Sequence, residues 1–243
     1  MIRTIWYRVT LIFLTIYYGL KVIVAALILR IPNRHGGVYD ETTKRWSAWQ
    51  LKAAGVKVRT VGFENIPKGR PVVFVSNHQS WFDIISLAAT LPHTTRFLSK
   101  KELAKVPLLG KAMQVAGHIF LDRQNRQKAF AAYEAIAQVV SNGMNAVVFA
   151  EGTRSRTGEL QPFKKGPFVL AIAAQVPVVP VYCAHTFGIS PKGSIRIHPR
   201  PVTLYFGKPI STEGMTYEER NELLARVRAV IEQFSVDAAR DSH

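Results

Sequence analysis

The sequence predicts an α/β protein in which helices cover a mostly parallel sheet, preceded by an N-terminal membrane-associated helical segment. Two observations predict this. Short apolar runs alternate with helix-like stretches from residue 56 onward, and residues 9–29 are almost entirely apolar. No internal repeat, low-complexity segment or linker divides residues 56–243. We therefore expect two units, an anchor of residues 1–55 and a single α/β domain of residues 56–243.

Six runs in the second unit are predicted to be strands, because they are β-branched, continuously apolar and bounded by turn residues. They are residues 71–76, 95–100, 118–122, 146–150, 176–183 and 202–206. The helices expected between and after them are residues 83–91, 127–141, 163–175 and 217–239. Strands that alternate with helices in this way favour a parallel sheet covered on both faces.

Residues 9–29 form an apolar stretch with a single charge, Lys21. As a helix it would be about 30 Å long, enough for one membrane span. Gly19 and Lys21 lie near its middle, and Tyr17 and Tyr18 also fall in mid-segment. These features favour a helix–turn–helix that dips into one leaflet, with a true span or a buried core helix as alternatives.

The end of the first unit also has an amphipathic pattern. Trp46, Trp49 and Ala53 fall at helical spacing among basic residues, which is typical of a helix resting at a membrane interface. Packing of the two tryptophans onto the domain is the alternative. Basic residues are denser after the apolar stretch than before it, so the globular part is expected on the cytoplasmic face of the membrane.

The net charge of the chain indicates which kinds of molecule it binds. The chain has 32 lysines and arginines against 16 acidic residues, a formal net charge of +16. Such a balance favours nucleic acid, anionic phospholipid membranes or phosphorylated substrates, with a basic surface kept for solubility as the alternative. Neither a helix-turn-helix nor a basic face interleaved with aromatic residues is visible, so we expect no nucleic acid. With one cysteine, Cys183, and no ligand cluster, we expect no metal.

Polar segments follow four of the predicted strands. They are NHQSWFD (77–83), KKEL (100–103), DRQNR (122–126) and EGTRSRTG (151–158). Ligands bind outside the carboxyl ends of the strands in parallel sheets. We therefore expect these segments to meet at one rim of the sheet.

His78 and Asp83 are candidates for acid–base chemistry. An aspartate at the start of a helix can fix the tautomer of the histidine and leave its other nitrogen as a base. The alternative is a helix-capping aspartate beside a histidine in a turn. Ser76 or Ser80 is a conceivable nucleophile, but the chain contains no G-x-S-x-G elbow.

The segment EGTRSRTG has the composition of an anion site. Gly152 and Thr153 offer a backbone amide and a hydroxyl, and Arg154 offers forked donors that suit a phosphate. It is not a Walker A loop, which argues against nucleotide hydrolysis. Glu151 is expected to orient an arginine or close the turn. A candidate base, His78, is expected beside these cations, and the domain is basic and attached to a membrane anchor. Together these features suggest chemistry on a hydroxyl group of an anionic lipid.

Four segments together resemble a known family. NHQSWFD, GHIFLDR, EGTRS and VPVVPV are similar to the four ordered blocks of the PlsC-type glycerolipid acyltransferases, the 1-acyl-glycerol-3-phosphate acyltransferases. The resemblance covers about residues 65–210 and implies that residues 56–243 are a glycerolipid acyltransferase domain. It also implies an N-terminal two-helix element that dips into the membrane.

The resemblance implies a reaction. An acyl chain would pass from acyl-CoA or acyl carrier protein, as co-substrate and without a cofactor, to the sn-2 hydroxyl of lysophosphatidic acid, giving phosphatidic acid. Another lysolipid acceptor, such as lyso-ornithine lipid or a lysophospholipid, is the alternative. His78 would be the general base and Asp83 its orienting carboxylate, with no acyl-enzyme.

The remaining motif residues match positions that bind the substrates. Arg123 and Arg154 match the residues that hold the acceptor phosphate, and Glu151, Gly152 and Thr153 complete that third block. Lys100 matches a lysine that supplies a further phosphate contact, with Lys101 as the adjacent alternative. Pro180 matches the proline of the fourth block, in the acyl-donor region.

Overall fold

The computed structural model describes residues 1–34, 36–92, 94–122 and 126–241. Within them, seven strands form one sheet in the order β1-β7-β6-β2-β5-β3-β4. All neighbours pair in parallel except β6 and β7, which are antiparallel. The strands are β1 (Val58–Val61), β2 (Val73–Ser76), β3 (Thr95–Lys100), β4 (Ile119–Leu121), β5 (Asn145–Phe149), β6 (Val178–Ala184) and β7 (Val202–Phe206). The predicted fold class is confirmed.

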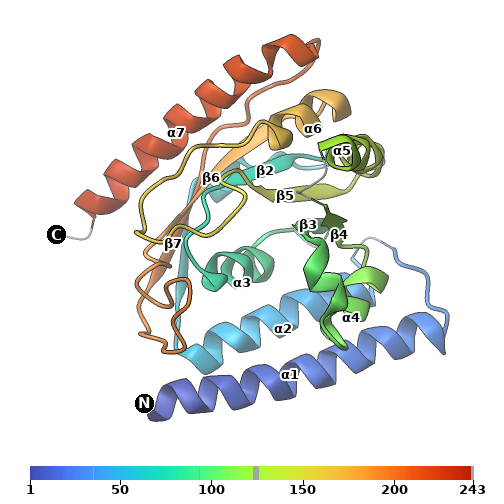
Figure 1. Ribbon diagram of the computed structural model, residues 1–243, viewed down its shortest axis with the longest axis vertical. Helices are drawn as coiled ribbons and strands as arrows, with labels where there is room; N and C mark the ends of the chain where they lie inside the picture. The colour runs from blue at the N-terminus through green and yellow to red at the C-terminus, as the bar shows by residue number, and fades with distance from the viewer. Residues whose placement is uncertain (35, 93, 123–125, 242–243) are drawn as a thin grey trace.

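Helices cover both faces of this sheet (Figure 1). On one face lie α5 (Arg126–Ser141), α6 (Gly166–Ala174) and α7 (Arg220–Arg240), and on the other lie α3 (Trp81–Thr90) and, beyond it, α2 (Val38–Ala54). Strand side chains alternate between the two cores. Val73 and Val75 pack into the α5–α7 core, whereas Phe74 packs into the α3 core. Continuous apolar strands are thus buried on both sides.

The N-terminal helix α1 (Ile2–Leu27) is continuous, and it lies alongside α2 as the outermost element on the α3 side (Figure 1). The predicted break near Gly19 and Lys21 is therefore wrong. The reason is packing: a Cβ on Gly19 would lie 3.0 Å from Cγ of Leu108. Glycine at this position permits a close approach between helices rather than a turn. The chain reverses after the helix, in the segment before α2.

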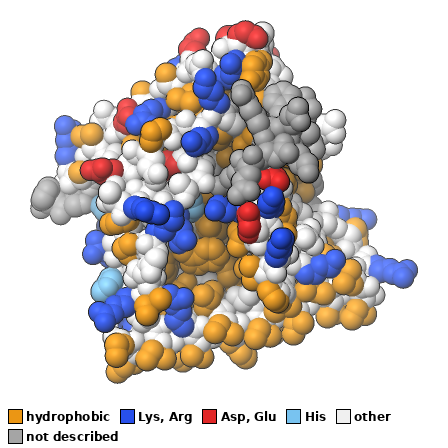
Figure 2. Space-filling view, viewed as in Figure 1, with side chains coloured by type: hydrophobic (Ala, Val, Ile, Leu, Met, Phe, Trp, Pro, Cys, Tyr) orange, Lys and Arg blue, Asp and Glu red, His pale blue; other side chains and the backbone are white. Residues whose placement is uncertain are grey.

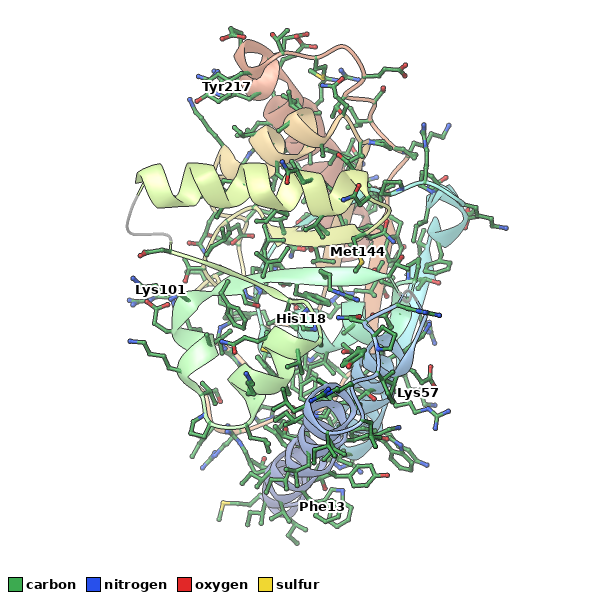
Figure 3. The ribbon with its side chains drawn as sticks, turned by 90° about the vertical axis from the view of Figure 1, so that its right-hand side faces the viewer. Phe13, Lys57, Lys101, His118, Met144 and Tyr217 are labelled. Atoms are coloured by element: carbon green, nitrogen blue, oxygen red, sulfur yellow. The ribbon has the colours of Figure 1, made fainter. Side chains whose placement is uncertain are left out.

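α1 has one buried face and one exposed apolar face. Tyr7, Tyr18 and Val22 are buried, whereas Phe13 is 66% exposed and points away from the body of the protein (Figure 3). The other exposed apolar residues of this helix include Ile5, Trp6, Val9, Ile12, Ile16, Tyr17, Leu20 and Leu27. They form the row of hydrophobic side chains along the lower margin of Figure 2. By length and composition α1 could cross a membrane.

The two tryptophans of α2 have different surroundings. Trp46 donates its indole N–H to Oγ1 of Thr15 over 3.2 Å and meets the ring of Trp81 edge-on. Trp49 is 47% exposed. Trp46 therefore packs onto the domain, which was the alternative considered from the sequence. Of the two tryptophans, Trp49 is the one exposed to a membrane interface.

A buried ion pair fixes α2 to the sheet. Arg96 of β3 donates to the carboxylate of Asp40 in the first turn of α2, and both side chains are almost fully buried. Arg96 also donates to Oδ1 of Asn33, in the connection between α1 and α2, over 3.2 Å. Because removing one partner of a buried ion pair leaves an uncompensated charge, these contacts hold the helical pair in one position.

Candidate active site

His78 and Asp83 are in direct contact beyond the carboxyl end of β2. Nδ1 of His78 lies 2.8 Å from Oδ2 of Asp83, whose side chain is fully buried. The same oxygen accepts the backbone N–H groups of Gln79 and Ser80, at 2.6 and 2.8 Å. Ser80 is the N-cap of α3 and completes a capping box with Asp83. Asp83 therefore caps the helix and also orients the histidine, so both arrangements considered from the sequence are present.

The histidine ring is held in one plane. It stacks on Phe149 with the ring centroids 4.0 Å apart and the planes 17° apart. The side chain is 12% exposed. With Nδ1 engaged by Asp83, Nε2 is the nitrogen left to take up and release a proton.

The backbone of this loop is fixed from both sides. The His78 N–H donates to Oε1 of Glu151 over 3.0 Å, and the His78 carbonyl accepts the N–H of Ser155 over 2.7 Å. Asn77 exchanges two hydrogen bonds with the backbone of Cys183 in β6, at 2.7 and 3.2 Å. The histidine is therefore positioned by the loops after β2 and β5 and by the end of β6.

Glu151 lies beneath the histidine. It is 2% exposed and is not among the residues that line the cavity described below. Burial raises the pKa of Glu151 to about 7, the charge of Asp83 adds to this shift, and the hydrogen bond from the His78 N–H opposes it. A carboxyl group with this pKa exchanges its proton near neutral pH. Here that carboxyl group is hydrogen-bonded to the backbone N–H of the candidate base.

A cavity of about 350 Å³ opens beside His78, in the size range of small-molecule sites. Most of its lining is apolar and comes from α1, α2, α3, α4 (Leu109–Val115) and β3. Figure 2 shows a hollow with a hydrophobic interior and Lys and Arg side chains at its edge. The rim end of the cavity carries His78, Lys100, Thr153, Arg154 and Lys192. The inner end carries Val22, Thr42, Thr43, Phe97 and His118.

The two ends are joined along β3. Lys100 ends this strand and Phe97 lies three residues earlier, about 10 Å away at the usual rise of a strand. At the inner end, His118 accepts the Phe97 N–H over 3.2 Å (Figure 3). Burial, together with the smaller effect of the Arg96 charge, lowers the pKa of His118 to about 3, so this ring is neutral. The contact of His118 with the Phe97 N–H is structural.

The structure distinguishes the two adjacent lysines. Lys100 lines the cavity, whereas Nζ of Lys101 lies 2.7 Å from Oδ2 of Asp122 and this residue is not part of the lining. Gly152, Thr153 and Arg154 all line the cavity, and Gly152 has a φ of +72°, which favours glycine. The loops after β2, β3 and β5 therefore meet at one rim, as expected for three of the four polar segments, and residues 123–125 of the fourth lie outside the described residues.

Arg123 and Pro180 are the two remaining predicted residues. Arg123 lies outside the described residues. Pro180 is buried within β6, opposite Val75 of β2, and does not line the cavity. In the part of the chain that the structure describes, no group of three or more His, Cys, Asp or Glu side chains could hold a metal ion.

Sequence reasoning missed several contributors. Lys192, in the connection between β6 and β7, lines the rim end and lies in none of the four motifs. The walls supplied by α1 and α2 were also missed, because the sequence suggested a membrane contact for these helices and not a place in the cavity. Their small and polar lining residues, such as Thr15 and Thr43, were the available signal.

Comparison with known proteins agrees with this geometry. The family model described as Acyltransferase matches residues 57–184, more than half of the chain. The chain belongs to this acyltransferase family. The match includes His78, Asp83, Lys100 and Arg154, whereas Lys192 lies beyond its end.

Individual relatives are similar over most of this chain. It is 39% identical over 72% of its length to the 1-acyl-sn-glycerol-3-phosphate acyltransferase of Saccharomyces cerevisiae. It is 31% identical over 81% of its length to that of Cocos nucifera. These alignments cover 58% and 63% of the relatives, so the chain spans about three fifths of the length of these curated proteins.

A solved structure is similar over nearly the whole fold. The 1-acyl-sn-glycerophosphate (LPA) acyltransferase PlsC from Thermotoga maritima superposes with a TM-score of 0.79 at 26% sequence identity. The match covers 96% of this chain and 94% of that protein. The family resemblance seen in the four motifs is therefore confirmed, and it extends to the N-terminal helices.

Proposed function

We propose that this protein transfers an acyl chain from acyl-CoA or acyl carrier protein to the sn-2 hydroxyl of 1-acyl-glycerol-3-phosphate, giving phosphatidic acid. The observation that carries the proposal is the juxtaposition of His78 and Asp83 with Lys100 and Arg154 at the rim of an apolar cavity. The names of the relatives support the acceptor. A lysolipid offers the hydroxyl, the phosphate and the hydrocarbon chain that these three features suit.

In the proposed mechanism His78 acts as a general base. Its Nε2 takes the proton of the acceptor hydroxyl as the oxygen attacks the thioester carbonyl. A new C–O bond forms, the C–S bond breaks, and the proton on His78 passes to the departing thiolate. Asp83 holds the ring in the required tautomer and stabilises the imidazolium that forms transiently. No acyl-enzyme is needed, because the substrate brings its own nucleophile.

The other residues position the substrates. Lys100 and Arg154 would bind the acceptor phosphate by charge-assisted hydrogen bonds, and Gly152 and Thr153 would complete the anion site. Since Glu151 is buried and bound to the His78 N–H, we propose that it positions the base rather than touching the phosphate. The roles of Arg123 in phosphate binding and of Pro180 in the acyl-donor region stay predictions.

We also propose that the protein is held on a membrane by α1. One face of this helix packs on α2 and α4, while the opposite face exposes a continuous apolar row, which suits a helix lying in the plane of one leaflet. Anionic phospholipids would attract the basic domain, and the distribution of basic residues favours the cytoplasmic face of the plasma membrane.

The proposal is tested by purified protein in mixed micelles, with lysophosphatidic acid, a lysophospholipid, lyso-ornithine lipid and a monoacylglycerol as acceptors. Each acceptor is combined with acyl-CoA and with acyl carrier protein. We expect the highest kcat/KM with lysophosphatidic acid and a loss of about 10²–10⁴ in kcat for His78→Ala. His198→Ala, which changes an exposed histidine, is the matched control. Near-wild-type transfer by His78→Ala would refute the base assignment.

A further inference from the structure

Lys192 lies at the rim of the cavity although no motif contains it. It belongs to the connection between β6 and β7, and its Nζ donates to Oγ1 of Thr153 over 3.0 Å. Among the described residues, the lysines and arginines that line the cavity are Lys100, Arg154 and Lys192. They come from three separate segments, so they surround a common space rather than lie along one loop.

The charge at this rim is not balanced within the lining. No aspartate or glutamate is among the described residues that line the cavity. By contrast, the neighbouring Lys101 already has Asp122 as its partner. Lys192 donates a hydrogen bond to a neutral hydroxyl, that of Thr153. A group of cations without a lining carboxylate, beside an apolar cavity, suits an anionic ligand with a hydrocarbon chain.

The loop that carries Lys192 is fixed on both sides of this residue. Before it, the carbonyl of Ser190 accepts the hydroxyl of Ser80, the N-cap of α3, over 2.8 Å. After it, the carbonyl of Ile195 accepts Nη2 of Arg8 over 3.0 Å. The side chain of Ile189 is fully buried, which gives the loop an apolar attachment as well. The position of the lysine is therefore set by the catalytic helix α3 and by α1.

We propose that Lys192 is a third ligand of the acceptor phosphate, kept at the rim by Thr153 until the substrate arrives. This inference rests on the proposed function. A phosphate monoester carries a charge of about −1.5 to −2 at neutral pH and has three strong acceptor oxygens. Lys100, Arg154 and Lys192 would each donate to it. The lysine thereby favours acceptors with a phosphate monoester over uncharged acceptors with the same hydroxyl and acyl chain.

The test compares Lys192→Ala and Lys192→Arg with the wild type in mixed micelles. The acceptors are lysophosphatidic acid and a monoacylglycerol with the same acyl chain. Loss of one charge-assisted hydrogen bond is expected to raise KM for lysophosphatidic acid about tenfold or more, with KM for acyl-CoA unchanged. Lys192→Arg should recover most of this loss. Lys208→Ala is the matched control, because Lys208 is exposed and follows β7, whose antiparallel pairing places this end beside the start of β6 and away from the rim.

Three outcomes would overturn the inference. The first is an unchanged KM for lysophosphatidic acid in Lys192→Ala. The second is an equal loss with the monoacylglycerol, which indicates a structural role. The third is a change that leaves KM for lysophosphatidic acid unaltered. If only KM for acyl-CoA changes, the lysine contacts the donor. If only sedimentation with vesicles of phosphatidylcholine and phosphatidylglycerol changes, the lysine contacts lipid headgroups. Failure of the proposed function is distinct, because the wild type would then not acylate lysophosphatidic acid.

Discussion

The rim end and the inner end of the cavity are built in different ways. The rim end is formed by loops that follow the parallel strands β2, β3 and β5 and by the connection between β6 and β7, and its side chains are charged or polar. The inner end is formed where α1, α2 and α4 pack over β3, and its side chains are mostly apolar or neutral. One end is thus placed by the sheet, whereas the other depends on how helices dock onto it.

This difference separates two kinds of function. The sheet positions the loops of the rim relative to one another, which suits proton transfer and phosphate binding. The inner end has a boundary set by helix packing, which suits discrimination by the length of a hydrocarbon chain. Changes at the rim should therefore affect kcat or the acceptor KM for all acyl chains, whereas changes at the inner end should depend on the chain.

The largest expected effect at the rim comes from Asp83→Asn. The amide can no longer stabilise a protonated His78 or select its tautomer, so we expect kcat to fall by about 10²–10⁴. Ser80→Ala is the matched control, since it removes the cap hydroxyl but leaves the His78–Asp83 contact. It should lower the stability of the fold by about 1 kcal/mol with little change in kcat. Equal losses of kcat would mean that Asp83 acts only as a cap.

Glu151 provides a pH-dependent effect beneath the rim. Its pKa is about 7 in the folded protein against an ordinary value of 4.5, so between these values the folded state holds a proton that the unfolded state has lost. Stability therefore decreases as pH rises through this range. Glu151→Gln keeps an acceptor for the His78 N–H but does not titrate.

The measurement is the denaturant midpoint of the wild type and of Glu151→Gln from pH 4.5 to pH 8. The free energy of unfolding of the variant should increase relative to that of the wild type as pH rises, by up to about 3 kcal/mol. A difference that does not depend on pH would contradict the raised pKa.

Substitutions of Lys100 and Lys101 test which of these adjacent lysines binds the acceptor phosphate. Lys100→Ala should raise the KM for lysophosphatidic acid about tenfold, because one charged donor to the phosphate is lost. Lys101→Ala removes an exposed ion pair with Asp122 and should change that KM less than about twofold. Steady-state kinetics with the acceptor varied decides the matter, and the reverse order of effects would assign the phosphate to Lys101.

The smallest effect is expected at the inner part of the cavity. Ala112→Leu adds bulk to the wall contributed by α4, so turnover of lysophosphatidic acids with long acyl chains should fall several-fold while those with short chains are unaffected. Gln114→Leu adds an apolar side chain to the exposed side of the same helix and is the matched control. Rates measured with a series of lysophosphatidic acids of different chain length would contradict the comparison if all of them slowed equally.

The sheet and the rim were largely predictable from the sequence. Six of the strands are apolar runs, and parallel strands bring their carboxyl ends to one edge, so His78, Lys100 and Arg154 could be placed together. The edge strand β1 was missed because it has only four residues and most of its side chains are exposed. The antiparallel direction of β7 was also missed, since a short apolar run contains no signal of strand direction.

The inner end could not be predicted. Its walls depend on the packing of α1 against α4, which a local apolar pattern does not report. Gly19 shows the difficulty: in the sequence it suggests a turn, but in the structure it allows close contact with Leu108. The place of Lys192 at the rim was not predicted for a related reason. The loop that carries it is held by hydrogen bonds from Ser80 and Arg8, and both residues are far from this loop in the sequence.

A single oxygen of Asp83 accepts both the candidate base and the first amides of α3. A chain in which this helical turn has not formed has no oriented histidine, even if the sheet is already paired. The return of catalytic activity during refolding would therefore follow the first turn of α3 rather than the overall content of secondary structure. The proposed acyl transfer would then serve as a kinetic reporter for one local folding event.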